Sequence, residues 1–523
     1  MTSATRLEHD LLGELEIPAD AYWGIHTARA VANFDLRGRP MHPEFIRCLA
    51  LVKKACAQAN MRAGILDHDI GNAICAACDE VAQLRHQPGT EPSQAASPTA
   101  KALSPPGTNG TGAGQVTEPP ATERPSQEAP SPGLLPPLHT HFPVDALQGG
   151  AGTSTNMNMN EVLANRAIEL LGGVKGDYSR VHPNDHVNLS QSTNDVFPTA
   201  VKVAAIRMMH RAAEAMTELQ NALQKKETEF ARVLKLGRTE MQDAVPVTGG
   251  QMFAAWAQAI QRDWWRLWKM EERLRQVNLG GTALGTGLNA PLKYVHSVVE
   301  HLRDLAGIGL ARAENLIDCT QNCDPFVEAS GMLKAAAVDL AKIAADLRIL
   351  SSGPRGGFGE LRLPPLQAGS SIMPGKVNPV ATEAVTQAAF QVMANDQAIT
   401  LAAQAGQLEL NAFIPLIADN LFESLDLTER ATRLLTDKCI AGIEVDEARC
   451  RTLLENSAAL ATAMVPHLGY EKATEIAKRA VAGEGSVPEL LLAEGLLDQE
   501  QLQALTSPEQ LTTPGVVGAK LRR

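Results

Sequence analysis

The chain has 523 residues with 59 acidic and 47 basic side chains, so its formal net charge is −12. An acidic chain of this length can bury a sizeable core, and its charge gives no electrostatic reason to bind nucleic acid or an anionic membrane. No apolar run reaches the roughly 18 residues that a membrane-spanning helix needs, and no secretion signal is visible. We therefore expect a cytoplasmic protein.

Residues 87–138 break the globular pattern. They hold 12 of the chain's 31 prolines and no Phe, Tyr, Trp, Ile or Met. This composition cannot bury enough apolar surface to offset the entropy of ordering, which predicts a disordered insertion. Because the flanking sequences look like two ends of one domain, we predict an N-terminal domain at 1–193 that the insertion interrupts.

Beyond the insertion, the sequence is mostly helical. Within 331–350, two apolar positions repeat every seven residues. They are Leu333, Leu340 and Leu347, and Ala336, Ile343 and Leu350. Such a seam is typical of a helix that buries a narrow stripe against its neighbours.

Further long helices are predicted around 196–233, 243–276, 379–403 and 417–441, with no series of short alternating strands. The fold class is therefore mainly α. We predict a long central bundle at 194–448 and a small C-terminal helical domain at 449–523.

The eight cysteines are scattered, as is typical of reduced thiols. Cys75 and Cys78 form a Cys-x-x-Cys pair in a helical stretch, and no second pair of ligands follows nearby. Helix packing explains this pair better than a metal ion, so we predict no metal site.

Four stretches combine Gly or Pro with many Ser, Thr and Asn residues. They are GGAGTSTN at 149–156, NLSQSTND at 188–195, GRTEMQD at 237–243 and GSSIMPGKVNP at 369–379. One such stretch alone would indicate only a helix cap or turn. Four together indicate a shared polar pocket, in which hydroxyls, amides and helix N-termini donate hydrogen bonds and Lys376 adds a positive charge. Such a pocket suits a small dicarboxylate.

The stretch GSSIMPGKVNP resembles the signature of the fumarase/aspartase superfamily, and the other three stretches match further blocks of it in order. The aspartase branch is most similar, through AYWGIHTARA from residue 21, QGGAGTSTNMNMNEVLANRA from 148, GRTEMQDAVP from 237 and QAGQLELN from 404. The resemblance implies a three-domain subunit whose central helices join those of three partners. The active sites of the resulting homotetramer would each be assembled from three subunits.

The resemblance also implies a reaction, the reversible deamination of L-aspartate to fumarate and ammonia through an enediolate, with no cofactor. Ser370 would be the general base that removes the Cβ proton. The implied substrate contacts are Lys376 and Asn378 at the α-carboxylate, Thr153, Ser192, Thr193 and Ser371 at the β-carboxylate, and Asn194 and Thr239 at the amino group. Glu240 and Met373 join this substrate-binding set without an assigned contact. Since no His–Asp pair sits beside Ser370, Lys376 and backbone N–H groups would have to stabilise its alkoxide.

Two alternatives stay open. The first is fumarate hydration by a class II fumarase, a branch that usually has a His at the position of Glu240, paired with a Glu that corresponds to Glu383. Two carboxylates there would repel each other, which favours the deaminase and leaves the local role of Glu240 undefined. The second alternative is a catalytically silent structural or binding homologue. The intact Ser370, Lys376 and Asn378 argue against that alternative.

Overall fold

The computed structural model describes residues 4–83 and 141–518, so the insertion predicted at 87–138 lies outside the described residues. The described part is mostly helical, with a few short strands, which confirms the predicted fold class. None of its helices combines the length and the apolar character needed to cross a membrane. The predicted domain boundaries stay predictions.

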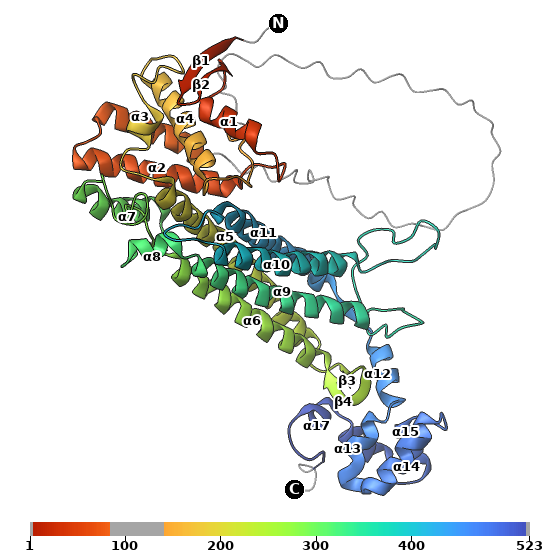
Figure 1. Cartoon of the computed structure of the whole chain (residues 1–523). Coiled ribbons are helices and arrows are strands. Elements are labelled where there is room, and N and C mark those ends of the chain that lie inside the picture. The colour runs from red at the N-terminus through yellow and green to blue at the C-terminus, as the bar shows by residue number, and fades with distance from the viewer. Residues whose placement is uncertain (1–3, 84–140, 519–523) are drawn as a thin grey trace, which may run out of the picture.

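The N-terminal part combines a hairpin with four helices (Figure 1). Its elements are β1 (Thr5–Asp10), β2 (Gly13–Pro18), α1 (Ile25–Asn33), α2 (Pro43–Ala63), α3 (His68–Ala82), α4 (Thr153–Leu170) and the short π-helix η2 (Pro183–Val187). The buried Glu161 carboxylate accepts backbone hydrogen bonds from Gly24, His26 and Thr27, and so fixes the start of α1 against α4. These contacts satisfy donors that a helix N-terminus leaves free.

Five long helices run side by side as the central bundle (Figure 1). They are α5 (Thr193–Glu229), α6 (Gly249–Leu274), α9 (Asp324–Leu350), α10 (Val380–Gln404) and α11 (Ile414–Lys438). All six side chains of the seven-residue seam on α9 are buried, which confirms that prediction. Short elements connect α6 to α9: β5 (Gln276–Val277), α7 (Leu292–Ala306), β6 (Ala311–Arg312) and α8 (Leu316–Gln321).

The prediction of a helix from residue 243 was wrong at its start. Residues Gln242–Thr248 form strand β4, which pairs antiparallel with β3 (Leu234–Thr239). The turn between them has only two residues, Glu240 and Met241, both with positive φ (53° and 63°). Such turns normally take Asn or Gly, so this sequence lacks the usual hairpin signal. Four two-stranded sheets occur in the described residues, none of them predicted.

The C-terminal part is a group of short helices. It contains β7 (Leu361–Arg362), η3 (Ile440–Gly442), β8 (Glu444–Val445), α12 (Glu447–Glu455), α13 (Ala459–Leu468), α14 (Tyr470–Val481), α15 (Val487–Ala493), α16 (Gln499–Leu505) and α17 (Pro508–Thr512). Apolar side chains of α12 to α16 form a core of their own, separate from that of the bundle, whereas Leu361, Ile440 and Ile443 are buried in the bundle core. Leu236 of β3 is buried in this C-terminal core, so the hairpin is packed against helices that lie more than 200 residues later in the chain.

Candidate active site

Two of the four polar stretches meet where α4 and α5 begin, at what we call the head end of the bundle. Asn156 of α4 donates a hydrogen bond from Nδ2 to the Thr193 hydroxyl, 3.0 Å away. The starts of α4 and α5 approach each other closely. A Cβ on Gly152, the residue before α4, would lie only 2.4 Å from the ring of Phe197 on α5. The side chains of Thr193 and Asn156 are buried.

The N-terminus of α5 is capped by its own residues. Ser192 and Asp195 form a capping box, in which each side chain accepts a backbone hydrogen bond from the other residue. The second Asp195 oxygen accepts N–H bonds from Gly280 and Thr282, both at 3.1 Å. Burial raises the pKa of Asp195 to about 7, although these hydrogen bonds lower it.

A buried lysine lies beneath the same stretch. Lys53 of α2 is fully buried, and its Nζ donates to Asn188 Oδ1 (2.9 Å) and Gln191 Oε1 (2.8 Å). Asn188 Oδ1 also accepts from the amides of Asn156 and Asn160, so one oxygen joins α2, α4 and the turn before α5. Burial lowers the pKa of Lys53 to about 8.

Thr153 and Asn194, the other predicted residues at the head end, have local partners. The Thr153 hydroxyl donates to the carbonyl of Gly150 (2.7 Å), and Asn194 Nδ2 donates to the carbonyl of Ala283 (2.7 Å). A narrow cavity beside Asn194 is also lined by Leu410 and Asn411. The QAGQLELN block (residues 404–411), which follows the C-terminal end of α10, therefore lies at the head end.

Thr239 and Glu240 lie at the tip of the β3–β4 hairpin. This hairpin begins where α5 has ended, and we call this end of the bundle the hairpin end. Both tip residues are exposed. A positive φ at a non-glycine residue is strained and occurs often at functional sites. The unusual turn is therefore consistent with a functional hairpin tip.

The loop at 369–379 precedes α10 and contains the remaining predicted residues. The Ser370 hydroxyl accepts backbone hydrogen bonds from Met373 (2.9 Å) and Ile372 (3.2 Å). The loop is closed at its base, where Gly369 bonds the carbonyl of Lys376 and Asn378 Nδ2 donates to the carbonyl of Gly369. A Cβ on Gly369 would lie 2.6 Å from that Lys376 oxygen, so only glycine fits.

The side chains of this loop face outward. Ser371, Met373 and Lys376 are exposed, while Ser370 and Asn378 are partly buried. The loop lies at the hairpin end, because the chain enters it from Glu360, whose side chain pairs with Arg238 of β3. In Figure 1 the segment before α10 projects from the end of the bundle away from α2 and α4.

One chain therefore does not bring all the predicted residues together. Thr153 and Ser192–Asn194 lie at the head end, whereas the hairpin tip and the loop 369–379 lie at the other. The two ends are separated by the 37 residues of α5, about 55 Å at 1.5 Å per residue. A single dicarboxylate spans only a small part of that distance.

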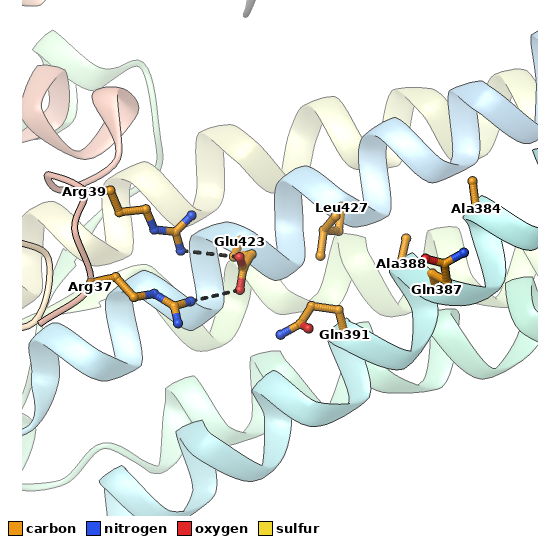
Figure 2. Close-up of a pocket in the computed structure, with 8 residues that line it drawn as sticks. All are labelled: Arg37, Arg39, Ala384, Gln387, Ala388, Gln391, Glu423 and Leu427. Carbon is orange, nitrogen blue, oxygen red and sulfur yellow. Dashed lines mark hydrogen bonds and ion pairs between the residues drawn. The ribbon is translucent and has the colours of Figure 1, made fainter.

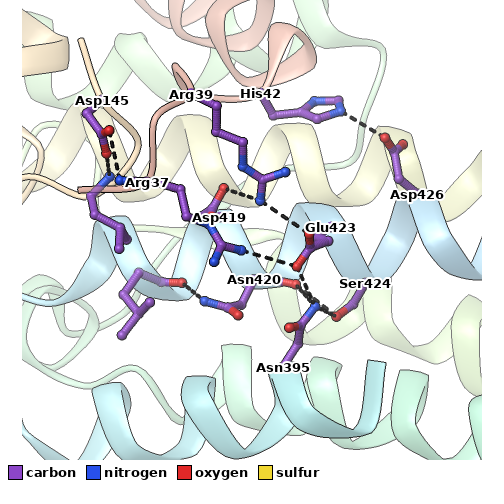
Figure 3. A network of polar contacts seen from close by, with 12 residues as sticks. Arg37, Arg39, His42, Asp145, Asn395, Asp419, Asn420, Glu423, Ser424 and Asp426 are labelled. Carbon is purple, nitrogen blue, oxygen red and sulfur yellow. Dashed lines mark hydrogen bonds and ion pairs between the residues drawn. The ribbon is translucent and has the colours of Figure 1, made fainter. Parts of the chain in front are cut away.

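The structure also contains a groove that the sequence did not suggest. It has a volume of about 640 Å³, and Figure 2 shows Arg37, Arg39 and Glu423 at one end of it. These arginines are already paired: Arg37 Nε lies 2.9 Å from Asp419, and Arg39 lies 3.0 Å from the same carboxylate. Figure 3 shows this network fastening the segment before α2 onto α11. None of the predicted site residues lines the groove, and we assign it a structural role.

Sequence reasoning missed Lys53 and Asp195, and it gave no role to Asn156 or Asn188. The only signal for Lys53 is a charged residue within an apolar stretch, LALVKKACA. Its neighbour Lys54 lies on the next face of the helix and pairs with Asp79 at 2.6 Å. Among the described residues, no group of three or more His, Cys, Asp or Glu side chains is placed to hold a metal.

Comparison with known families defines the class. The family model described as "Lyase" matches residues 13–97 and 137–394, and that described as "Fumarase C C-terminus" matches 460–513. The first match is interrupted inside the segment 87–138. Together with the bundle and the four polar stretches, these matches establish that the chain belongs to the fumarase/aspartase family of lyases.

Its curated relatives are more specific. Aspartate ammonia-lyase of Bacillus subtilis is 42% identical, over 99% of this chain and 98% of the relative. The enzymes of the same name from Pseudomonas aeruginosa and Escherichia coli are 44% and 40% identical, each over 98% of this chain and over 98% and 97% of the relative.

Solved structures agree with the fold. A fumarate lyase:delta crystallin from Brucella melitensis, bound to cobalt, superposes with a TM-score of 0.85 at 44% identity, covering 98% of this chain and all of that one. A class II fumarase from Schistosoma mansoni reaches a TM-score of 0.82 at 30% identity, with the same coverage.

Proposed function

We propose that this lyase deaminates L-aspartate reversibly to fumarate and ammonia. The observation that carries this proposal is the identity of 40–44%, over nearly the whole chain, to enzymes named aspartate ammonia-lyase. The geometry of the Ser370 loop supports the same chemistry. The proposed reaction is a carbon–nitrogen bond cleavage that begins with removal of the Cβ proton.

Ser370 is the general base in this proposal. Its Oγ already accepts two backbone N–H bonds, and the same donors would stabilise the alkoxide that can take a proton. The hydroxyl lies partly buried beside exposed loop residues, so a substrate can approach it. After proton removal the negative charge develops on the β-carboxylate, which becomes a doubly charged enediolate.

Hydrogen-bond donors that face this charge lower the barrier, each by roughly 3 kcal/mol on the precedent of oxyanion holes. Thr153, Ser192, Thr193 and Ser371 are the proposed donors, while Lys376 and Asn378 hold the α-carboxylate. Asn194 and Thr239 reach the amino group, which leaves as ammonia.

Complete sites require other copies of the chain, because one copy holds the residues about 55 Å apart. We propose a homotetramer with each site assembled from three subunits: one copy provides the head end, one the hairpin tip and one the loop 369–379. Apolar side chains on the outside of the bundle support this assembly, since Val338, Phe390 and Leu401 are at least 50% exposed in the single chain. Light scattering coupled to size exclusion measures the mass directly.

Glu240 decides between the two reactions of the family. Hydration needs a group that positions and deprotonates water, whereas an ionised Glu240 can only accept hydrogen bonds. A carboxylate is compatible with the ammonium group of aspartate. We expect kcat/KM for L-malate to be at least a hundredfold below that for L-aspartate, which corresponds to about 2.7 kcal/mol.

The test follows fumarate by its ultraviolet absorbance after the purified protein is mixed with either substrate. Clear absorbance from L-aspartate with little from L-malate is the expected result. Equal kcat/KM values would refute the assignment of specificity. Absence of fumarate from both substrates would favour the silent homologue.

A further inference from the structure

The strand that carries Thr239 is tied to the rest of the chain by a cluster of three charges, of which Glu360 and Lys235 are buried and Arg238 is partly buried. The Glu360 carboxylate is fully buried, 3.1 Å from the Lys235 ammonium and 2.9 Å from the Arg238 guanidinium. Both cations belong to β3, and Arg238 directly precedes Thr239. A carboxylate from outside the hairpin therefore holds one charged side chain near each end of β3.

The hairpin has a β-bulge beside the two cations, both of which reach the same carboxylate. In a regular strand, residues three apart point to opposite faces. The register of β3 against β4 shifts between Leu236, which faces Pro246, and Arg238, which faces Asp243. Ala244 and Val245 of β4 therefore both lie opposite Gly237, so β4 carries the extra residue, and the side chains of Lys235 and Arg238 both reach Glu360. A Cβ on Gly237 would lie 2.4 Å from the Val245 carbonyl, so only glycine fits opposite this bulge.

Glu360 itself is held independently, through its backbone. Its N–H donates to the Leu350 carbonyl and its own carbonyl accepts from the Asp446 N–H, both at 2.9 Å. The next residue begins β7, which pairs with β8. The Glu360 side chain can therefore be changed while the contacts that place its own segment remain.

Arg238 has a second restraint. Its guanidinium lies over the Phe358 ring, 4.2 Å from the ring centre, and the Phe358 carbonyl accepts a hydrogen bond from Arg449 at 2.8 Å. A planar guanidinium satisfies both the stacking and the ion pair, whereas a lysine at this position keeps only the charge.

We propose that Glu360 is a positioning residue for recognition of the substrate's amino group. Through Lys235 and Arg238 its side chain sets the register of the hairpin and thus the place of Thr239 and Glu240 in the site. The inference rests on the proposed function, in which the hairpin reaches the amino group and other segments hold the carboxylates. Loosening the anchor therefore affects a substrate with an amino group more than a dicarboxylate without one.

The test compares L-aspartate with succinate, a dicarboxylate of the same chain length that lacks the amino group. In Glu360→Gln, we expect kcat/KM for aspartate to fall about thirtyfold, mainly through KM, while the inhibition constant of succinate changes less than about threefold. Arg238→Lys, which keeps the charge but loses the stacking, should give a smaller fall with an equally unchanged succinate constant. The matched control is Arg362→Gln, which breaks the ion pair with Asp446 and touches neither hairpin strand. It should behave like the wild type.

Two results would overturn the proposal: a wild-type kcat/KM in Glu360→Gln, or a parallel loss of aspartate turnover and succinate affinity, which indicates general structural damage. If Glu360→Gln does not assemble, Arg238→Lys decides by the same two criteria. Wild-type protein that forms no fumarate refutes the proposed function itself, before any variant is compared.

Discussion

The two ends of the bundle build their parts of the proposed site in different ways. At the head end, Asn188 Oδ1 alone accepts from Lys53, Asn156 and Asn160, so side chains from three segments are cross-linked in the interior. At the hairpin end, the loop 369–379 bonds largely to itself, and Ile372 is 83% exposed. The side chains of the head end are held in place before a ligand binds, which suits the proposed binding of the β-carboxylate. The loop has few ties to the rest of the chain and is suited to close over a ligand.

The strongest test of this contrast removes the proposed base. Ser370→Ala should lower kcat by about 10³-fold or more, the upper range for general acid–base catalysis, with little change in thermal stability because the loop is exposed. Steady-state kinetics and a thermal melt measure both. Ser351→Ala serves as a control, since this serine also lies at the surface and bonds a backbone carbonyl outside the site. Turnover above about a tenth of wild type would remove Ser370 from this role.

A mixing experiment tests whether the two ends come from different copies. Thr193→Ala and Ser370→Ala subunits, dissociated and reassembled together, should give about tenfold more activity than either variant alone. Some mixed sites then receive an intact Thr193 from one copy and an intact Ser370 from another. Reassembling each variant by itself is the control. Mixed oligomers without a gain would contradict the proposed assembly.

Lys376→Ala should mainly weaken binding. Loss of the only charged partner proposed for the α-carboxylate should raise KM for aspartate about a hundredfold and lower kcat as well. Lys342→Ala is a matched control, because Lys342 is exposed and pairs with Asp346 one turn later on α9. An unchanged KM would show that Lys376 does not contact substrate.

The buried lysine at the head end predicts a pH dependence. The pKa of Lys53 is lowered to about 8, so its positive charge is lost as the pH rises through 8, and attraction for a bound dicarboxylate weakens. Among the groups near Lys53, Asp195 has a pKa near 7, so most of its titration lies below this range. Burial raises the pKa of the Cys56 thiol to about 12 and that of Cys78 well above its usual value, so both thiols stay neutral below pH 9.

Succinate is the suitable probe, since it has no amino group to titrate. Its inhibition constant should rise about threefold between pH 7.5 and 9 in the wild type, roughly 0.7 kcal/mol. In Lys53→Met the rise should be much smaller, because only the end of the Asp195 titration then falls in this pH range. The same rise in both proteins would assign the titration to another group.

The smallest effect is expected from deleting 87–138 and joining the ends with a short turn. The composition of this segment offers no core, and the family match skips 98–136. We expect kcat/KM and oligomer mass within about twofold of wild type. Strong amide protection from hydrogen exchange throughout the segment would show that its composition was misinterpreted.

Sequence patterns predicted the helical class and the α9 seam because both follow from local periodicity. They predicted the four polar stretches, but not the distance between them, which depends on how long helices run past each other. Lys53 and Lys54 are adjacent and chemically identical. Only their phase on α2 and the packing of α4 and α5 decide which one is buried.

The β3–β4 hairpin was missed for a different reason. Its turn residues, Glu240 and Met241, lack the intrinsic preference for positive φ, so tertiary contacts at Glu360 and in the C-terminal core must compensate. Local sequence does not report contacts with residues that lie more than a hundred positions away.

The burial of Leu236 in the C-terminal core has a consequence for synthesis on the ribosome. Residue 248 emerges about 200 residues before Leu454, the first buried side chain of that core after the hairpin, which is roughly 10 to 40 s at 5–20 residues per second. During this interval the hairpin lacks its apolar partners. For roughly the first half of it, Glu360, the ion-pair partner of Arg238, has not yet been translated either. A chain whose translation stops between residues 379 and 454 would therefore carry the head end, Glu360 and the Ser370 loop but a hairpin without its apolar partners. The last stretch to be translated thus controls when the nascent polypeptide completes the packing of its hairpin.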